Sequence, residues 1–316
     1  MKSGWIWPQK KSRCSMNKLM IWYGELITGK KLMKRGLFFL TPGMLWLILF
    51  LVLPGLILVV VSFAGRGSYG ELVWEFGLDN YKRLIGFGIF GWTPDYIYIL
   101  LRSLLVAIVT TLISVILSYP LCFYIARKPE RTRYLWLTIV IIPFWTNMVI
   151  RTYSWFLILA PEMPLAKIAA FFNLVDPGMP LYPSAFAVYL GMISMFLPFV
   201  ALPLFSSIER LDWTLVEAAQ DLYASNYRIF MHAILPQTLP GLSVGIILTL
   251  VPAMGMFVVP DLLGGAKYML VGNLIQQQFG ASRDWAFGAA ISMGLMVLTM
   301  FSLYLYKRKI KDIDLL

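Results

Sequence analysis

The chain has 316 residues, of which 59% are hydrophobic, and its mean hydropathy is +0.74. Only 14% are charged, well below the roughly 25% of a soluble domain, which excludes a water-soluble globular protein and indicates an integral membrane protein. The two cysteines, Cys14 and Cys122, lack the number and spacing of a disulfide framework or a metal site. The sequence contains no GxxxxGK[ST] phosphate-binding loop, so any uphill work takes its energy from a partner or an ion gradient.

Residues 1–36 form a basic segment that contains three tryptophans, Trp5, Trp7 and Trp22. Lysine and tryptophan together favour a segment at the level of the lipid headgroups, and a partly disordered basic tail is the alternative. The first long apolar run begins near Leu37, too late for a cleaved signal peptide. We expect it to stay in the protein as its first membrane span.

Six apolar segments have the roughly 20 residues that a helix needs to cross a bilayer core of about 30 Å. They cover residues 37–63, 98–125, 137–160, 184–206, 242–260 and 286–306. An even number of spans places both termini on the same side. The fold class that we expect is therefore an all-α integral membrane protein with six transmembrane helices.

The basic residues indicate which side is cytoplasmic. The two terminal segments and the loops 126–136 and 207–241 hold 19 of the 27 Lys and Arg residues, whereas the loops 64–97, 161–183 and 261–285 hold six. Positively charged loops stay on the inner side, so both termini are expected in the cytoplasm. The net charge of +11 then mainly reflects orientation and does not indicate a nucleic-acid partner.

Prolines interrupt the second to fifth spans, and each proline removes a backbone donor and favours a kink. Single kinks are common in membrane helices, but four interrupted spans fit a transporter better than a lipid anchor. The outer loop 64–97 has a mixed pattern that includes Gly77-Leu78-Asp79-Asn80-Tyr81, and the loop 161–183 contains four prolines around a short helix expected at about 165–173. The prolines that interrupt the second to fifth spans are Pro120, Pro143, Pro198, Pro203 and Pro252.

The inner loop 207–241 contains an amphipathic helical pattern with small residues on one face. Glu217-Ala218-Ala219 is followed by Asp221, Leu222, Tyr223, Ala224 and Ser225, and a second helical piece with Phe230, Ala233 and Ile234 is expected to end at Pro236 and Pro240. Small residues allow a partner's backbone to approach closely. A helix that merely rests on the membrane is the alternative, although such helices normally carry more Lys and Arg.

This segment resembles the EAA motif of ABC-importer permeases, in which Glu-Ala-Ala is followed at fixed spacing by Gly, Ile and Leu-Pro. Glu217, Ala218, Ala219, Leu235 and Pro236 match, whereas Tyr223 replaces the glycine and Ala233 the isoleucine. The glycine marks a turn where a positive φ is favoured, so the tyrosine raises a question about the turn geometry. Further similarity to permeases of bacterial spermidine/putrescine importers covers residues 37–306, including Pro143–Asn147, Leu204–Glu209, Asp261–Lys267 and Arg283–Ala290.

The resemblance implies the MetI-like fold of type I ABC-importer permeases and a transport role without enzymatic activity or a cofactor. Residues 37–306 would form the six-span permease domain, 207–241 its cytoplasmic coupling loop and 307–316 a basic cytoplasmic tail. The implied partners are a second permease subunit, an ABC ATPase dimer that hydrolyses ATP, and a periplasmic or extracellular polyamine-binding protein, all at the bacterial inner membrane. The coupling residues would be Glu217, Ala218, Ala219, Asp221, Leu222, Tyr223, Ala224 and Ser225.

Four residues are candidates for the path of a polycation. If the third span rises as one helix from Leu137, Trp145 lies about 12 Å along it, near the middle of the membrane, with Asn147 about 3 Å further and Tyr153 in the outer half. Aromatic rings attract ammonium groups by about 0.5–2 kcal/mol per contact, although plain helix packing explains these residues equally well. Asp261, near the outer end of the fifth span, could meet the incoming cation or simply cap a turn.

Other charged residues are weaker candidates. Arg151 lies within a span and is expected to pair with an acidic group or to face a helix interface. Asp95, Glu162 and Asp176 lie outside the spans, and His232 has no nucleophile or metal ligand at a useful spacing.

Two alternatives stay open. The same architecture could serve another small solute, such as a phosphonate, iron or thiamine. An ion-coupled secondary carrier would normally show inverted repeats or ionisable residues within the spans. The sequence shows no fixed-period repeat and no acidic residue within the core of a span.

Overall fold

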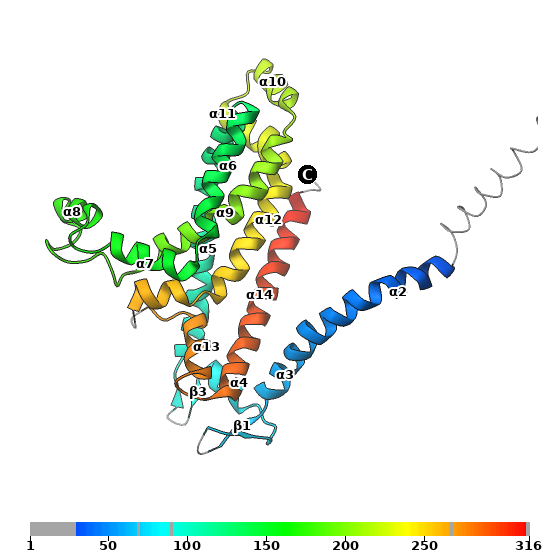
Figure 1. Ribbon diagram of the computed structural model, residues 1–316, viewed down its shortest axis with the longest axis vertical. Helices are drawn as coiled ribbons and strands as arrows, with labels where there is room; N and C mark the ends of the chain where they lie inside the picture. The colour runs from blue at the N-terminus through cyan, green and yellow to red at the C-terminus, as the bar shows by residue number, and fades with distance from the viewer. Residues whose placement is uncertain (1–29, 68–69, 89–90, 266–267, 314–316) are drawn as a thin grey trace, which may run out of the picture. The chain divides into compact units, whose positions relative to one another are not determined.

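The computed structural model describes residues 30–67, 70–88, 91–265 and 268–313 (Figure 1). Three parts of the sequence-based predictions fall outside the described residues. They concern the first 29 residues, Ala266-Lys267 of the outer motif and the last three residues of the basic tail. The chain divides into two compact units, Met1–Val60 and Val61–Leu316, and each is described by itself.

The first unit is helical throughout its described part. Helix α2 (Lys30–Leu47) continues through a π-helical turn, η1 (Ile48–Val52), into α3 (Leu53–Ser62). Residues Phe39–Ser62 are long and apolar enough to cross a membrane. Large apolar side chains along it are exposed in the isolated chain, with Leu51 at 70%, as expected for a helix whose surroundings are lipid or other subunits. The helix expected at 37–63 is confirmed.

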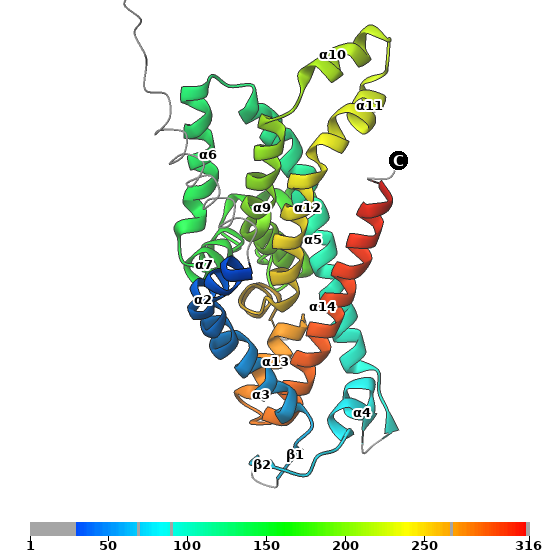
Figure 2. The ribbon, with the colours of Figure 1, turned by 90° about the vertical axis from the view of Figure 1, so that its right-hand side faces the viewer.

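Four long helices form the centre of the second unit (Figures 1 and 2). Helix α9 (Ala185–Glu209) packs against both α5 (Asp95–Ala126) and α12 (Leu235–Gly255), and α12 also contacts α14 (Trp285–Ile313). The fully buried residues between them are mostly aliphatic and small, and include Val106, Val188, Met192, Leu204 and Met254.

The shorter elements cover the ends and flanks of these helices. Two antiparallel hairpins, one pairing Gly65 with Val73 and the other Phe87 with Trp92, flank a short helix at the end opposite α10 (Figure 2). The shorter elements are β1 (Gly65–Arg66), β2 (Leu72–Val73), α4 (Asp79–Ile85), β3 (Phe87–Gly88), β4 (Gly91–Trp92), α6 (Glu130–Trp145), α7 (Met148–Ile158), α8 (Pro164–Phe171), α10 (Trp213–Asp221), α11 (Asn226–Ile229), η2 (Phe230–Ile234), η3 (Pro260–Gly264) and α13 (Val271–Phe279). Helix α8 agrees with the short helix expected at 165–173.

Five helices among the described residues are long and apolar enough to span a membrane, and a sixth span exists if the bent pair α6 and α7 counts as one. The expectation of a straight third span is therefore wrong. Helix α6 begins at Glu130 rather than near Leu137, ends at Trp145, and meets α7 at an angle of 95°. Trp145 lies about 22 Å from the start of its helix, and Asn147 lies beyond its end.

The expected ending of the second inner helix at Pro236 and Pro240 is also wrong, because residues Asn226–Gly255 form one continuous helix. A π-helical turn, η2, precedes Pro236, and in it Leu235 N donates to Phe230 O. This wider turn accommodates a proline, which lacks a backbone donor and crowds the carbonyl of the preceding turn. The second half of the EAA pattern is therefore continuous with a helix long and apolar enough to span a membrane.

Helix α12 approaches α9 closely through two glycines. A Cβ atom on Gly241 would collide with the carbonyl of Pro203 and the hydroxyl of Ser207, and one on Gly245 would lie 3.0 Å from Val200 Cα. Small residues at such crossings bring membrane helices into direct backbone contact. The two helices that flank the coupling segment are thus packed without intervening side chains.

At the end with the hairpins, one buried carboxylate joins three elements. Asp284 is 1% exposed and accepts hydrogen bonds from Arg83 Nη1 at 2.9 Å, Arg66 Nη1 at 3.3 Å and the backbone N–H of Phe287 at 3.1 Å. The Arg83 guanidinium also lies 3.9 Å from the centre of the Phe287 ring. Asp284 therefore caps α14 and fixes the first hairpin and α4 against it.

Candidate functional site

Residues 210–234 form a helical hairpin that projects from one end of the second unit (Figures 1 and 2). Its first helix, α10, begins at Asp212, whose Oδ1 accepts hydrogen bonds from the Thr214 N–H at 3.0 Å and the Thr214 hydroxyl at 2.7 Å. Its second helix, α11, begins at Ser225, whose hydroxyl oxygen accepts from Arg228 N. Both N-caps are residue types that satisfy the free donors of a helix start.

The turn between the two helices has the geometry that the EAA pattern predicts. Tyr223, in the place of the motif glycine, has a φ of +54°, Ala224 N donates to Ala219 O at 3.1 Å, and Tyr223 N donates to Gln220 O at 2.9 Å. These two bonds define a Schellman motif, which places a left-handed residue, usually glycine, just after the helix. The turn forms despite the tyrosine, at the energetic cost of a left-handed non-glycine residue.

Replacing this tyrosine by glycine should stabilise the hairpin. We expect Tyr223→Gly to raise the free energy of local unfolding of the hairpin by about 1 kcal/mol, because glycine adopts a positive φ without steric cost. The side chain is 98% exposed, so the change removes no packing. Amide hydrogen exchange of residues 213–229 in the membrane-extracted protein would measure the change, with Tyr227→Gly, at an exposed helical position of φ below zero, as the control that should instead destabilise. Faster exchange in Tyr223→Gly would contradict the argument.

The hairpin has a small core of its own. Leu211, Val216 and Ile229 are 5–6% exposed, and four half-buried residues pack around them, namely Ala219, Ala224, Ala233 and Ile234. The small-residue face expected for a partner is thus partly used inside the hairpin, since Ala219 and Ala224 turn toward this core. The alanines let the two short helices lie close together.

Side-chain contacts attach the hairpin to the long helices. Gln237 donates to Ala233 O at 2.8 Å and accepts from the backbone N–H of Asp212 at 2.9 Å. Phe230 packs against the Tyr119 ring of α5 at 5.3 Å, and the Tyr119 hydroxyl lies 2.9 Å from that of Thr238. A force on α10 therefore reaches α9 and α12 through the chain and α5 through Tyr119.

The outer surface of the hairpin is formed by the other predicted coupling residues. Glu217, Ala218, Asp221 and Ser225 are exposed, and the tip presents large side chains, with Leu222 at 82% exposure. An exposed apolar tip beside carboxylates is typical of a protein-interaction surface. Sequence reasoning missed Tyr227, which is 73% exposed and completes this tip.

A second candidate site is the elbow between α6 and α7, which comprises residues Pro143–Arg151. Thr146 and Asn147 are extended, and the Asn147 side chain caps α7 by accepting from Val149 N at 2.8 Å. Trp145, the last residue of α6, is 81% exposed in the isolated chain. The signal for the break was present in the sequence as an asparagine that can cap a helix directly after a proline-containing turn.

Arg151 has a partner that the sequence did not predict. Its Nη1 donates to the backbone carbonyl of Pro143 at 2.9 Å, and no ion pair among the described residues includes it. Its guanidinium lies 6.0 Å from the centre of the Phe144 ring, and that ring packs edge-on against Phe199 of α9 at 4.9 Å. The expectation of an acidic partner for Arg151 is wrong, and the alternative of an interface position holds.

The remaining path candidates, Tyr153 and Asp261, lie on elements that pack against each other. Helix α7, which carries Tyr153, packs against η3, which carries Asp261. The Tyr153 side chain is 50% exposed, and Asp261 is exposed with its backbone N–H donating to Phe257 O. Within the described parts of the chain, no hydrogen bond or ion pair joins Trp145, Asn147, Tyr153 and Asp261.

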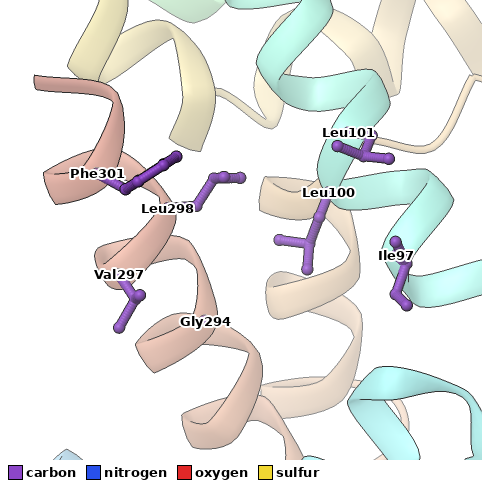
Figure 3. Close-up of a pocket in the computed structure, with 7 residues that line it drawn as sticks. All are labelled: Ile97, Leu100, Leu101, Gly294, Val297, Leu298 and Phe301. Carbon is purple, nitrogen blue, oxygen red and sulfur yellow. The ribbon is translucent and has the colours of Figure 1, made fainter. Parts of the chain in front are cut away.

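A pocket of about 300 Å³ between α5 and α14 does not suit a charged ligand (Figure 3). It is open, and all the side chains that line it are apolar, from Ile97, Leu100, Leu101, Gly294, Val297, Leu298 and Phe301. Burying an ammonium group there would leave its donors without acceptors. We therefore exclude this pocket as a site for a polar solute.

Comparison with known proteins identifies the relatives of this chain. Residues 118–312 match the protein family described as "binding-protein-dependent transport system inner membrane component". The chain is 41% identical over 263 residues to the spermidine/putrescine transport system permease protein PotB of Salmonella typhimurium, which covers 83% of this chain and 89% of that protein. It is 40% identical over 263 residues to the Escherichia coli K12 protein of the same name, covering 83% and 93%.

Solved structures share the fold at low sequence identity. The chain superposes on a chain of a bacterial alginate ABC transporter, in complex with an alginate-bound periplasmic protein, with a TM-score of 0.59 and 16% identity, covering 88% of this chain and 96% of that one. A second structure of a bacterial alginate importer gives a TM-score of 0.56 at 16% identity, covering 92% and 99%. At this identity the likeness establishes only the arrangement of the helices.

Proposed function

The chain belongs to the family of binding-protein-dependent transport system inner membrane components, and from this we infer that it is the permease subunit of an ABC importer for spermidine and putrescine. Its fold is the all-α, MetI-like permease fold of that family, with five long apolar helices and one broken span. The observation that carries the inference is the identity of about 40% to the PotB proteins along most of both chains.

The hairpin at residues 210–234 is the proposed docking site for the ATPase subunits. The chain itself has no phosphate-binding loop, so ATP would be hydrolysed by the partners, and the exposed EAA residues would receive the resulting motion. The proposed contact residues are Glu217, Ala218, Asp221, Leu222, Tyr223 and Ser225, with Ala219 and Ala224 supporting them from the hairpin core.

The proposed orientation places the hairpin and both termini in the cytoplasm. The connection 126–136 lies at the same end of the second unit as the hairpin, whereas β1, β2 and α4 lie at the other end (Figure 2). This arrangement agrees with the larger number of Lys and Arg in the segments expected inside. A soluble polyamine-binding protein would then deliver cargo at the outer side, to a path formed with a second permease subunit.

We propose that the cargo path includes the elbow. Trp145 offers an aromatic face, Asn147 an amide, Tyr153 a phenol ring and Asp261 a carboxylate, and a polyamine carries several ammonium groups separated by alkyl chains. Aromatic faces hold such groups weakly, which suits a transporter because the cargo must also leave.

The function is tested in proteoliposomes that contain the complete transporter. We expect ATP hydrolysis to rise when the binding protein is loaded with spermidine or putrescine, and to stay at the basal rate when it is empty. Binding proteins loaded with phosphonate, iron or thiamine serve as controls. Stimulation by one of these and none by polyamines would contradict the proposed cargo, while leaving the permease fold intact.

A further inference from the structure

The elbow brings the carbonyl end of α6 to a break in an apolar span. The last four carbonyls of a helix have no partner within it, and together they form the negative end of the helix dipole. In a membrane such groups require donors, because lipid supplies none. Helix α7 turns away by 95°, so its backbone does not continue the hydrogen-bond ladder of α6.

One of these carbonyls already holds a cation. The oxygen of Pro143 accepts hydrogen bonds from the Thr146 hydroxyl at 2.6 Å, from Thr146 N at 3.4 Å and from the Arg151 guanidinium at 2.9 Å. The Arg151 Nε is buried and has no hydrogen-bond partner. A charged group is therefore held here by a neutral carbonyl, with no carboxylate among its partners in the described parts of the chain.

The chemistry of this contact resembles the chemistry of the cargo. Like a guanidinium, a primary or secondary ammonium of a polyamine is cationic and carries N–H donors. Trp145, the adjacent helix-terminal residue, is largely exposed and offers a ring face to the alkyl-ammonium chain. Two cations at one carbonyl repel each other strongly where water is excluded, so the site accommodates one at a time.

On the basis of the proposed function, we propose that the carbonyl end of α6 is a binding site for a polyamine ammonium group. Arg151 is then the resident cation that the cargo displaces. The guanidinium is tethered, so it returns when the cargo moves on. Its return prevents rebinding and favours release. Arg151 thus sets how tightly the elbow retains its cargo.

Replacing Arg151 tests the exchange directly. In proteoliposomes with the complete transporter, we expect Arg151→Gln to lower the KM for spermidine, since the competing cation is gone. If Arg151 occupies the site about nine-tenths of the time, the decrease is about tenfold. Arg151→Lys keeps a tethered cation and should retain a KM near that of the wild type.

The matched control is Arg102→Gln. Arg102 is also an arginine within a long helix, but its guanidinium lies 4.0 Å from the centre of the Tyr268 ring rather than at a helix end. Its KM for spermidine should stay unchanged. A KM that is unchanged or raised in Arg151→Gln would overturn the proposed site, as would an equal decrease in Arg102→Gln.

A second measurement needs no variant. Spermidine whose nitrogens are fully methylated keeps its charges but has no N–H donors, and at a carbonyl site it should compete with spermidine at least tenfold more weakly. Equal competition would mean recognition by charge or by aromatic rings alone and would overturn the site. A wild-type complex that ignores spermidine overturns the proposed function itself, so the two failures are distinguishable.

Discussion

Reversing the charge of Glu217 (Glu217→Lys) is expected to separate this chain from its ATPase partner while leaving it folded in the membrane. Glu217 lies on the exposed side of α10, outside the small core formed by Leu211, Val216 and Ile229. Removing one member of a buried interfacial charge contact costs about 2–5 kcal/mol, so the amount of ATPase that co-purifies should fall by more than tenfold.

The matched control for this substitution is Glu130→Lys. Glu130 is an exposed glutamate in the first turn of α6, and α6 begins at the same end of the unit as the hairpin (Figure 2). It should leave ATPase recovery unchanged, and both variants should reach the membrane in wild-type amounts. Undiminished ATPase recovery with Glu217→Lys would remove the hairpin from the docking site.

The largest loss of stability is expected from Asp284→Asn. The carboxylate of Asp284 is buried and holds two guanidinium groups, from Arg66 and Arg83. Breaking a buried ion pair by removing one partner costs about 3–5 kcal/mol, and the partial exposure of both arginines, 45% and 39%, favours the lower end. The thermal unfolding midpoint of the detergent-extracted protein should fall by several degrees.

Asp79→Asn is the control for that measurement. Asp79 pairs with Lys82 at 3.0 Å, but both side chains are well exposed, at 87% and 64%, and exposed pairs contribute at most about 1 kcal/mol. Its midpoint should stay within error of the wild type. If the two variants melted alike, Asp284 would not have the structural role assigned to it.

The sequence predicted the long helices well because their length and apolar content are local properties. The turn in the hairpin was also predictable, because the spacing of the EAA pattern places Tyr223 where a left-handed residue is needed. Its φ of +54° shows that the backbone geometry of the motif forms with a side chain that disfavours it. The exposed surface of the hairpin could not be predicted in the same way. Which alanines face inward depends on how α10 and α11 pack against each other.

The two wrong predictions about helix ends have the same cause, since neither an apolar run nor a proline by itself decides where a helix ends. The mostly apolar run 137–160 predicts a single third span, although Asn147 ends that continuity by capping a new helix. Conversely, Pro236 and Pro240 predict a helix end, yet the π-helical turn before Pro236 lets the helix continue. A proline signals a lost hydrogen bond, and only the neighbouring turns decide whether the helix bends, widens or ends.

The Asp284 cluster could not be predicted from the sequence. Its two arginines lie 218 and 201 positions away along the chain, and such pairings follow only from the fold. The contact of Arg151 with Pro143 is local, eight positions apart, but it depends on the angle of the elbow.

The uninterrupted helix Asn226–Gly255 would also set the distance between the proposed ATPase partner and the lipid. Thirty residues extend over about 45 Å, whereas the hydrocarbon layer is about 30 Å thick. If the helix stands upright with its outer end level with the edge of that layer, the remaining length of about 15 Å, nearly three helical turns, extends beyond the acyl chains on the inner side. An ATPase bound at the end of this helix would then lie entirely in water. We therefore expect its affinity for the hairpin to be independent of the lipid headgroup composition.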